Sequence, residues 1–166
     1  MIKKILGYGF LVIILFFVAI AFIPSTFSPS VSMKMNKDRY SIQRTISDIQ
    51  QFRLWDPKAI SDSTVTFSYS LKGNSPFIEV TDSLDRIMAT YKIEKSTVDE
   101  VHISVNINNV DPLLYKFKLT SDGGGTVVNW SMNFDGNLMM LMFDVEGKLE
   151  KTFKGGLQTL NTLVSQ

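Results

Sequence analysis

Residues 101–134 read VHISVNINNVDPLLYKFKLTSDGGGTVVNWSMNF and contain three stretches in which apolar and polar side chains alternate. A period of two is typical of a strand with one buried face. Asp111-Pro112 and Gly123-Gly124-Gly125, both typical of turns, separate the stretches. The pattern predicts three antiparallel strands with a common apolar face. The residues of that face are Val101, Ile103, Val105, Ile107, Leu113, Tyr115, Phe117, Leu119, Val128, Trp130, Met132 and Phe134.

The same alternation extends toward the N-terminus. Further strands are expected around residues 65–71, 78–80 and 87–93, and an earlier one over 31–35. Between them, isoleucines at 42, 46 and 49 have helical spacing and lead into Trp55-Asp56-Pro57, where the proline restricts Asp56 to an extended conformation. Together these elements predict an antiparallel sheet that is covered on one face only.

The period changes after Asp135-Gly136-Asn137. From about Leu138 to Val164 apolar residues recur every three or four positions, which predicts a long amphipathic helix. Gly155 and Gly156 lie inside it, and each costs roughly 1 kcal/mol relative to alanine in a helix. We therefore expect a close approach of the backbone, a bend, or space beneath the helix at this point.

A strand, a helical pair, six antiparallel strands and a long C-terminal helix follow one another in the order of the α+β helix-grip fold. Three motifs extend the likeness: Ile42-x-x-x-Ile46-x-Asp48 with Trp55-Asp56-Pro57, then residues 124–130 (GGTVVNW), then Gly156-Leu157-x-x-Leu160. In this order they resemble the START-like, polyketide-cyclase-type (SRPBCC) superfamily over residues 31–166. The chain departs from the family pattern at residues 71–77, where many relatives have a longer glycine-rich hairpin.

The resemblance implies a curved sheet around the long helix, with an apolar cavity between them that takes a lipid, a polyketide or another hydrophobic ligand. Methionines adapt to irregular ligands, and buried tyrosines offer polar contacts. The same side chains would also serve as ordinary packed core. The residues predicted to line the cavity are Trp55, Phe67, Tyr69, Tyr91, Tyr115, Phe117, Trp130, Met132, Phe134, Met142, Phe153 and Gly156.

Three functions are open at this point. The first is binding of a lipid or other hydrophobic small molecule, and the second is a cyclase-like or hydrolase-like enzyme with Tyr and Asp side chains as acid and base. The third is a protein-interaction module with a filled core and an exposed apolar patch. The apolar stripes carry tyrosines as their titratable groups, so we expect binding rather than catalysis. Asp48 and Asp56, which flank the helical pair, are expected in cap or turn roles.

Composition excludes several classes of protein. The 166 residues fit one domain, and 45% hydrophobic residues with 20% charged residues exclude a disordered chain. A formal net charge of +1 does not predict binding to nucleic acid. The chain has no cysteine, and its single histidine, His102, is expected on the solvent-exposed face of its strand, pointing away from the cavity. We expect no metal, no cofactor and no covalent intermediate.

The N-terminal segment contains nineteen uncharged residues from Ile5 to Ile23. Its length predicts a transmembrane helix, so that residues 1–23 form an anchor, 24–30 a linker and 31–166 the folded domain. A cleaved signal peptide is the alternative, because Ala19-Ile20-Ala21 fits a small-x-small cleavage pattern. Lys3 and Lys4 precede the segment, which predicts a single-pass protein with a cytoplasmic N-terminus and an extracytoplasmic domain that takes its ligand from the membrane.

Overall fold

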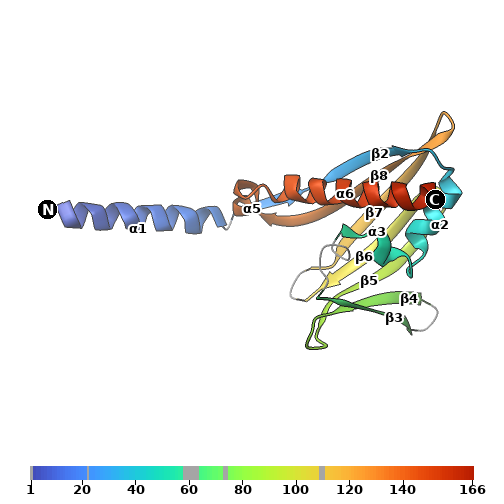
Figure 1. Ribbon diagram of the computed structural model, residues 1–166. Helices are drawn as coiled ribbons and strands as arrows, with labels where there is room; N and C mark the ends of the chain where they lie inside the picture. Colours follow the sequence, from blue (N-terminus) through green and yellow to red (C-terminus); the bar gives the residue numbers. More distant parts are fainter. Residues whose placement is uncertain (1, 22, 58–63, 73–74, 109–110) are drawn as a thin grey trace.

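A computed structural model describes the whole chain except residues 1, 22, 58–63, 73–74 and 109–110. The helices in Figure 1 are α1 (Ile2–Ala21), α2 (Arg39–Ser47), α3 (Phe52–Trp55), α5 (Leu138–Met142) and α6 (Val145–Ser165). The strands are β1 (Pro24–Phe27), β2 (Ser30–Met35), β3 (Thr66–Lys72), β4 (Ser75–Thr81), β5 (Ile87–Ser96), β6 (Glu100–Ile107), β7 (Leu113–Asp122) and β8 (Gly125–Asn137).

The described strands form a single antiparallel sheet in the order β1-β8-β7-β6-β5-β4-β3, and β2 also pairs with β8. β8 is the longest of these strands. One of its edges pairs with β7. The other edge pairs with β2 along its N-terminal part and with β1 along its C-terminal part. Trp130 therefore lies between Phe117 on β7 and Val31 on β2. The predicted α+β architecture, a curved antiparallel sheet with a C-terminal helix, is confirmed.

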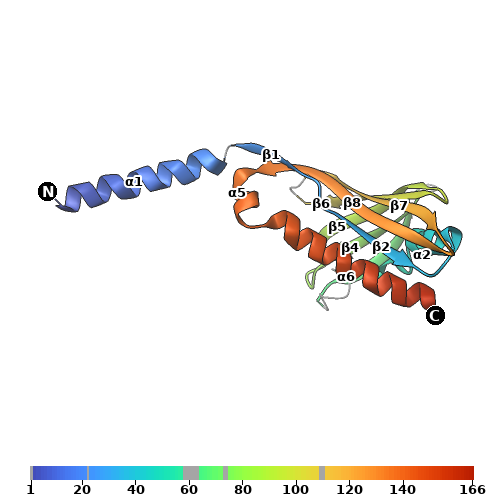
Figure 2. The same cartoon turned by 90° about the horizontal axis from the view of Figure 1, so that it is seen from above.

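Helix α6 crosses the apolar face of the sheet (Figures 1 and 2). Along β6 and β7, buried residues alternate with more exposed ones, as the period of two predicts. The β7–β8 connection is a tight hairpin through Gly123 and Gly124, with φ of 52° and 96°. Two consecutive positive φ values match the twist of the strands, and glycine adopts them without steric cost.

Helices α2 and α3 precede the main sheet. Asp38 caps α2, because its Oδ1 accepts a hydrogen bond of 3.0 Å from the Ser41 N–H. Helix α3 ends at Trp55, and Asp56 has φ −68° and ψ 127°. This is the extended conformation that Pro57 was predicted to impose.

The long C-terminal helix is interrupted. The residues that separate α5 from α6 include Asp144, which has φ 50° in the left-handed region. Its N–H donates to the Leu141 carbonyl at 3.0 Å, and its own carbonyl accepts from Lys148 at 3.1 Å. The prediction of a single helix was wrong, although the hydrophobic spacing continues across this turn. The break at Asp144 changes the direction of the chain before α6 begins.

The segment expected to be a linker contains a strand. β1 pairs with β8 in a register that sets Phe27 opposite Phe134. Phe27 is buried, and its ring stacks on that of Phe134 with centroids 5.1 Å apart. A buried aromatic ring and a backbone ladder make residues 24–27 part of the sheet.

The prediction of a single-pass membrane protein is contradicted. Among the residues that the structure describes, no helix combines the length and the apolar character needed to cross a bilayer. α1 ends at Ala21, so its uncharged part runs from Ile5 to Ala21 and covers about 26 Å, less than the roughly 30 Å of a hydrocarbon core. Ile23 already contacts the domain, since its carbonyl accepts from the Leu138 N–H at 3.0 Å. The predicted orientation across a membrane falls with the span.

Candidate functional site

A cavity of about 600 Å³ lies between α6 and the apolar face of strands β6 to β8. Its wall is mostly aliphatic and aromatic, with a few polar groups, which is the usual composition of a small-molecule site. The wall consists of Asp56, Pro57, Ile107, Leu113, Tyr115, Trp130, Met132, Lys148, Leu149, Lys151, Thr152, Phe153 and Gly155.

A second cavity of about 400 Å³ adjoins the first, because Leu113, Met132 and Leu149 line both. It extends toward α5, where Phe134 and Met140 contribute to its wall. The two cavities together offer apolar space along the N-terminal half of α6.

Trp130 is the centre of the aromatic wall. Its ring stacks on Phe153 of α6 with centroids 4.4 Å apart and meets Tyr115 edge-on at 5.3 Å. On the side away from the cavity it packs against Trp55 and Phe117, at 5.8 and 4.8 Å. These contacts hold the ring in place, because a close-packed ring can shift only if its neighbours shift as well.

The two glycines of α6 have different surroundings. A Cβ on Gly156 would lie 2.6 Å from Cζ3 of Trp130 and 2.9 Å from Cγ of Pro57. Gly155 lines the cavity, and a Cβ there would meet nothing within 4 Å. The expected close approach therefore occurs at Gly156, and open space lies beside Gly155.

Two buried indole groups have no hydrogen-bond partner among the described residues. They are Nε1 of Trp55 and Nε1 of Trp130. The two rings meet at 77°, and Trp55 also meets Phe117 at 89°. Edge-to-face packing places the positive edge of one ring near the negative face of another, which offsets part of the cost of an unpaired N–H.

Polar groups gather at the Asp56 side of the first cavity. Asp56 is 3% exposed and Tyr115 is 8% exposed, and both line the cavity. Burial raises the pKa of Tyr115, and the negative charge of Asp56 raises it further. The pKa of Tyr91, buried behind them, is raised in the same way, first by burial and then by Asp56. Both phenols therefore keep their protons and remain hydrogen-bond donors.

Lys148 and Lys151 provide the positive charge of the cavity wall. Both residues are exposed, so water screens their charge. The site therefore has a buried acidic group at one side and solvated basic groups at its mouth.

The structure brings most of the predicted residues together. The first cavity is lined by Tyr115, Trp130, Met132 and Phe153, and the second by Phe134. Directly behind this wall, Trp55, Phe117 and Gly156 pack against Trp130. Tyr91 is buried against Phe52 and does not line either cavity. Three residues lie elsewhere: Phe67 on β3 is partly buried and packs against the core, Tyr69 is 39% exposed, and Met142 is 57% exposed on α5. The Tyr69 hydroxyl donates to the Gln50 carbonyl at 3.0 Å. The sequence spacing of these residues predicted side chains that face the cavity. Phe67 and Tyr69 lie instead on the edge strand β3, and Met142 lies on α5, before the helix break at Asp144.

Asp56 is the chief residue that the motif analysis did not assign to the site. A cap or turn role was expected, and its N–H does close α3 by donating to the Phe52 carbonyl at 2.9 Å. Its side chain is nevertheless buried at the cavity. The signal in the sequence was Pro57, because it restricts Asp56 to an extended conformation directly after the buried Trp55.

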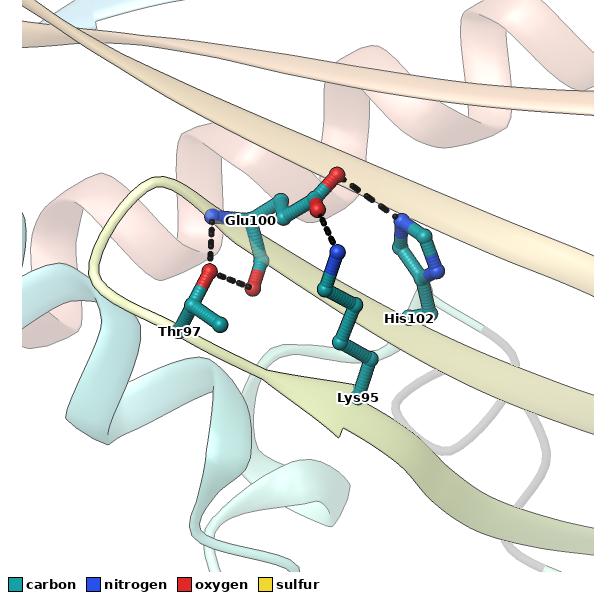
Figure 3. Close-up of polar contacts among 4 residues, drawn as sticks. All are labelled: Lys95, Thr97, Glu100 and His102. Carbon is teal, nitrogen blue, oxygen red and sulfur yellow. Dashed lines mark hydrogen bonds and ion pairs between the residues drawn. The ribbon is translucent and has the colours of Figure 1, made fainter.

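His102 is a separate candidate (Figure 3), and it does not line either cavity. Its Nε2 lies 3.2 Å from Oε2 of Glu100, which also pairs with Lys95. The hydrogen bond from Lys95 and the neighbouring charges lower the pKa of Glu100. The predicted polar-face position is confirmed, but the imidazole is only 22% exposed and has a carboxylate partner. The ion pairs of Glu100 with Lys95 on β5 and with His102 on β6 explain this cluster as part of the β5–β6 hairpin.

Other polar groups also have structural explanations. Asp82 accepts hydrogen bonds from the N–H groups of Leu84 and Arg86, at 2.9 and 3.0 Å, and so closes a turn. In the part of the chain that the structure describes, no three His, Asp or Glu side chains gather as metal ligands. The cavity is therefore the best candidate site.

Comparison with known proteins identifies the fold. No family model and no curated protein matches the chain. Solved structures do: KanY is 15% identical with a TM-score of 0.59, covering 86% of this chain and 99% of that one. CalU16 from Micromonospora echinospora is 10% identical with a TM-score of 0.56, covering 86% and 85%. DynU16, from the dynemicin biosynthetic locus, is 11% identical with a TM-score of 0.53, covering 84% of this chain and 47% of that one.

At such identities the similarity establishes the fold alone. Two of these neighbours, KanY and CalU16, match over most of their own length, whereas the match covers about half of DynU16. The chain therefore shares the α+β fold of these neighbours, and an apolar cavity lies beneath its C-terminal helix.

Proposed function

We propose that this protein binds an apolar small molecule in the cavity between the sheet and α6. The observation that carries the proposal is the cavity itself, about 600 Å³ with a mostly apolar wall. Burying apolar ligand surface there would contribute about 25 cal/mol per Å² before the costs of association. The adjoining space toward α5 suits an elongated ligand such as a lipid or a polyketide.

The motifs support membership of the SRPBCC superfamily, and the structural neighbours support the same fold class. The interaction-module alternative requires a filled core, and the cavity counts against it. The membrane tether is not part of the proposal.

A second candidate, catalysis of ring closure or hydrolysis, is favoured by one specific observation. The enzyme hypothesis requires a buried titratable group in the cavity besides tyrosine, and Asp56 is such a group. In this candidate the Asp56 carboxylate would accept a proton from the substrate. The neutral Tyr115 phenol would donate a hydrogen bond to the oxygen on which charge develops.

Native mass spectrometry of the purified full-length chain tests the binding function. We expect a bound apolar molecule at fixed stoichiometry, identified after solvent extraction. Leu149→Trp should abolish this species, because Leu149 lines both cavities and an indole would occupy them. Gln158→Trp is the matched control, since Gln158 lies on the exposed side of the same helix.

The outcomes separate the hypotheses. A ligand-free mass that stays unchanged after incubation with lipid extracts and aromatic polyketides would refute the proposal. Bound ligand retained in Leu149→Trp but lost in Gln158→Trp would place the site elsewhere. A mixture of ligand and chemically altered product would favour the enzyme.

A further inference from the structure

Gly155 lies in the middle of α6 and lines the first cavity. A glycine inside a helix costs about 1 kcal/mol relative to alanine, so its presence at this position calls for a reason. Glycine is favoured where φ is positive, where another part of the protein comes close to the backbone, and where a ligand does so.

The first two reasons do not apply to Gly155. The described glycines with positive φ are Gly123 and Gly124, in the β7–β8 hairpin. A Cβ on Gly155 would meet no atom of the described residues within 4 Å, whereas a Cβ on the adjacent Gly156 would lie 2.6 Å from Cζ3 of Trp130. Packing against the sheet therefore explains Gly156, and the approach of a ligand is the reason that remains for Gly155.

The surface of α6 around Gly155 suits contact with apolar groups. Thr152, which also lines the cavity, donates its hydroxyl to the Lys148 carbonyl at 2.9 Å. The Gly155 carbonyl accepts from the Thr159 hydroxyl at 3.2 Å. These polar groups are paired within α6, so an apolar ligand that lies against the backbone here leaves none of them without a partner.

On the basis of the binding function proposed above, we propose that Gly155 is the specificity-determining residue of the cavity. The ligand lies directly against the α6 backbone at this position, and the missing side chain sets the width of the molecule that the cavity admits. Because Gly156 packs α6 tightly against Trp130, the gap between helix and sheet cannot widen to compensate for a side chain at Gly155. Such a side chain would leave room for a narrow, flexible chain but not for a broad ring system.

Two fluorescent probes of different width test the proposal on the full-length chain. N-phenyl-1-naphthylamine is a broad ring compound, and cis-parinaric acid is a narrow chain. Gly155→Ala should weaken binding of the broad probe about tenfold, as insertion of a methyl group into a packed contact does, and should change binding of the narrow probe less than about twofold. Gly155→Leu should weaken binding of the broad probe at least about a hundredfold.

Gln158→Ala and Gln158→Leu are the matched controls, because Gln158 is exposed on the same helix and lines neither cavity. Both should bind the two probes as the wild-type chain does. Gly155→Ala is expected to resist urea at least as well as the wild type, since the alanine gains helix propensity and its methyl group meets open space. A loss of affinity in a variant of undiminished stability is a loss of fit and not of folding.

The outcomes distinguish this proposal from the binding function. If Gly155→Ala binds N-phenyl-1-naphthylamine as tightly as the wild type or more tightly, the methyl group lies in unused space, and the role of Gly155 is overturned while the binding function stands. Equal losses for the two probes would overturn selection by width, as would a wild-type chain that binds the narrow probe alone. If the wild-type chain binds neither probe, the binding function and the role of Gly155 fail together.

Discussion

The adjacent glycines of α6 should respond in opposite directions to the same substitution. Replacing either by alanine gains about 1 kcal/mol of helix propensity. At Gly155 the new methyl group meets open space, so the gain is retained. At Gly156 it would lie 2.6 Å from Cζ3 of Trp130, well inside van der Waals contact.

The Trp130 ring cannot move aside to admit this methyl group. It is 1% exposed and stacks on Phe153 at 4.4 Å, with Trp55 and Phe117 behind it. Overpacking of this kind costs about 1–3 kcal/mol, and the rigid surroundings favour the upper part of that range. Subtracting the propensity gain leaves Gly156→Ala about 1–2 kcal/mol less stable than the wild type. Gly155→Ala should be more stable by up to about 1 kcal/mol.

Urea unfolding of the three proteins measures the difference. With a slope of roughly 2 kcal/mol per molar urea, the midpoints of the two variants should differ by about 1–1.5 M. Because the fold is unchanged, the slopes should agree. If Gly156→Ala is as stable as Gly155→Ala, α6 does not press on Trp130, and the geometry of the cavity wall is wrong.

Two further predictions concern stability. The folded-state pKa values of Tyr91 and Tyr115 lie above the ordinary value of 10.0, so their contribution is complete below about pH 10 and is lost as the pH rises further. Tyr91→Phe should reduce the loss of urea resistance between about pH 9 and pH 11, and an unchanged loss would contradict this cause. Thr126 is fully buried and its hydroxyl donates to the Lys37 carbonyl at 2.8 Å, so Thr126→Val should cost about 1–2 kcal/mol in urea unfolding. The exposed Thr120→Val is its control, and equal effects would show that the hydrogen bond contributes nothing.

Local patterns predicted the sheet because each strand has its own period-two signal. The stripe that contains Tyr115 and Phe117 faces the core as its alternation requires. The same rule placed Tyr69 inward, yet it is 39% exposed. Alternation reveals which residues share a face but not how far the covering helix extends over it. β3 is the strand at the edge of the sheet that lies farthest from β8. The Tyr69 hydroxyl therefore donates a hydrogen bond to the Gln50 carbonyl instead of facing the cavity.

The helix break could not be predicted from periodicity. Apolar residues on both sides of Asp144 fit one continuous helix, and aspartate carries only a weak preference for the left-handed region. The end of the N-terminal helix could not be predicted from hydrophobicity either. The apolar run extends to Ile23, whereas the helix ends at Ala21. In both places the end of a helix depends on contacts that are distant in sequence, such as the hydrogen bond between Leu138 and Ile23.

The cavity follows from the way these features combine. Gly156 brings α6 close to Trp130, which fixes the distance between helix and sheet at one point. The break at Asp144 redirects the chain at the other end of the helix, so α6 is not held parallel to α5. Between these points lies Gly155, which lines the cavity and leaves room beneath the helix because it has no side chain. Asp56 also lines this space, and Pro57 holds its backbone in an extended conformation at the end of α3. A chain selected only for stability would fill such a space with a larger side chain. The unfilled volume beneath α6 therefore argues for a ligand rather than for imperfect packing.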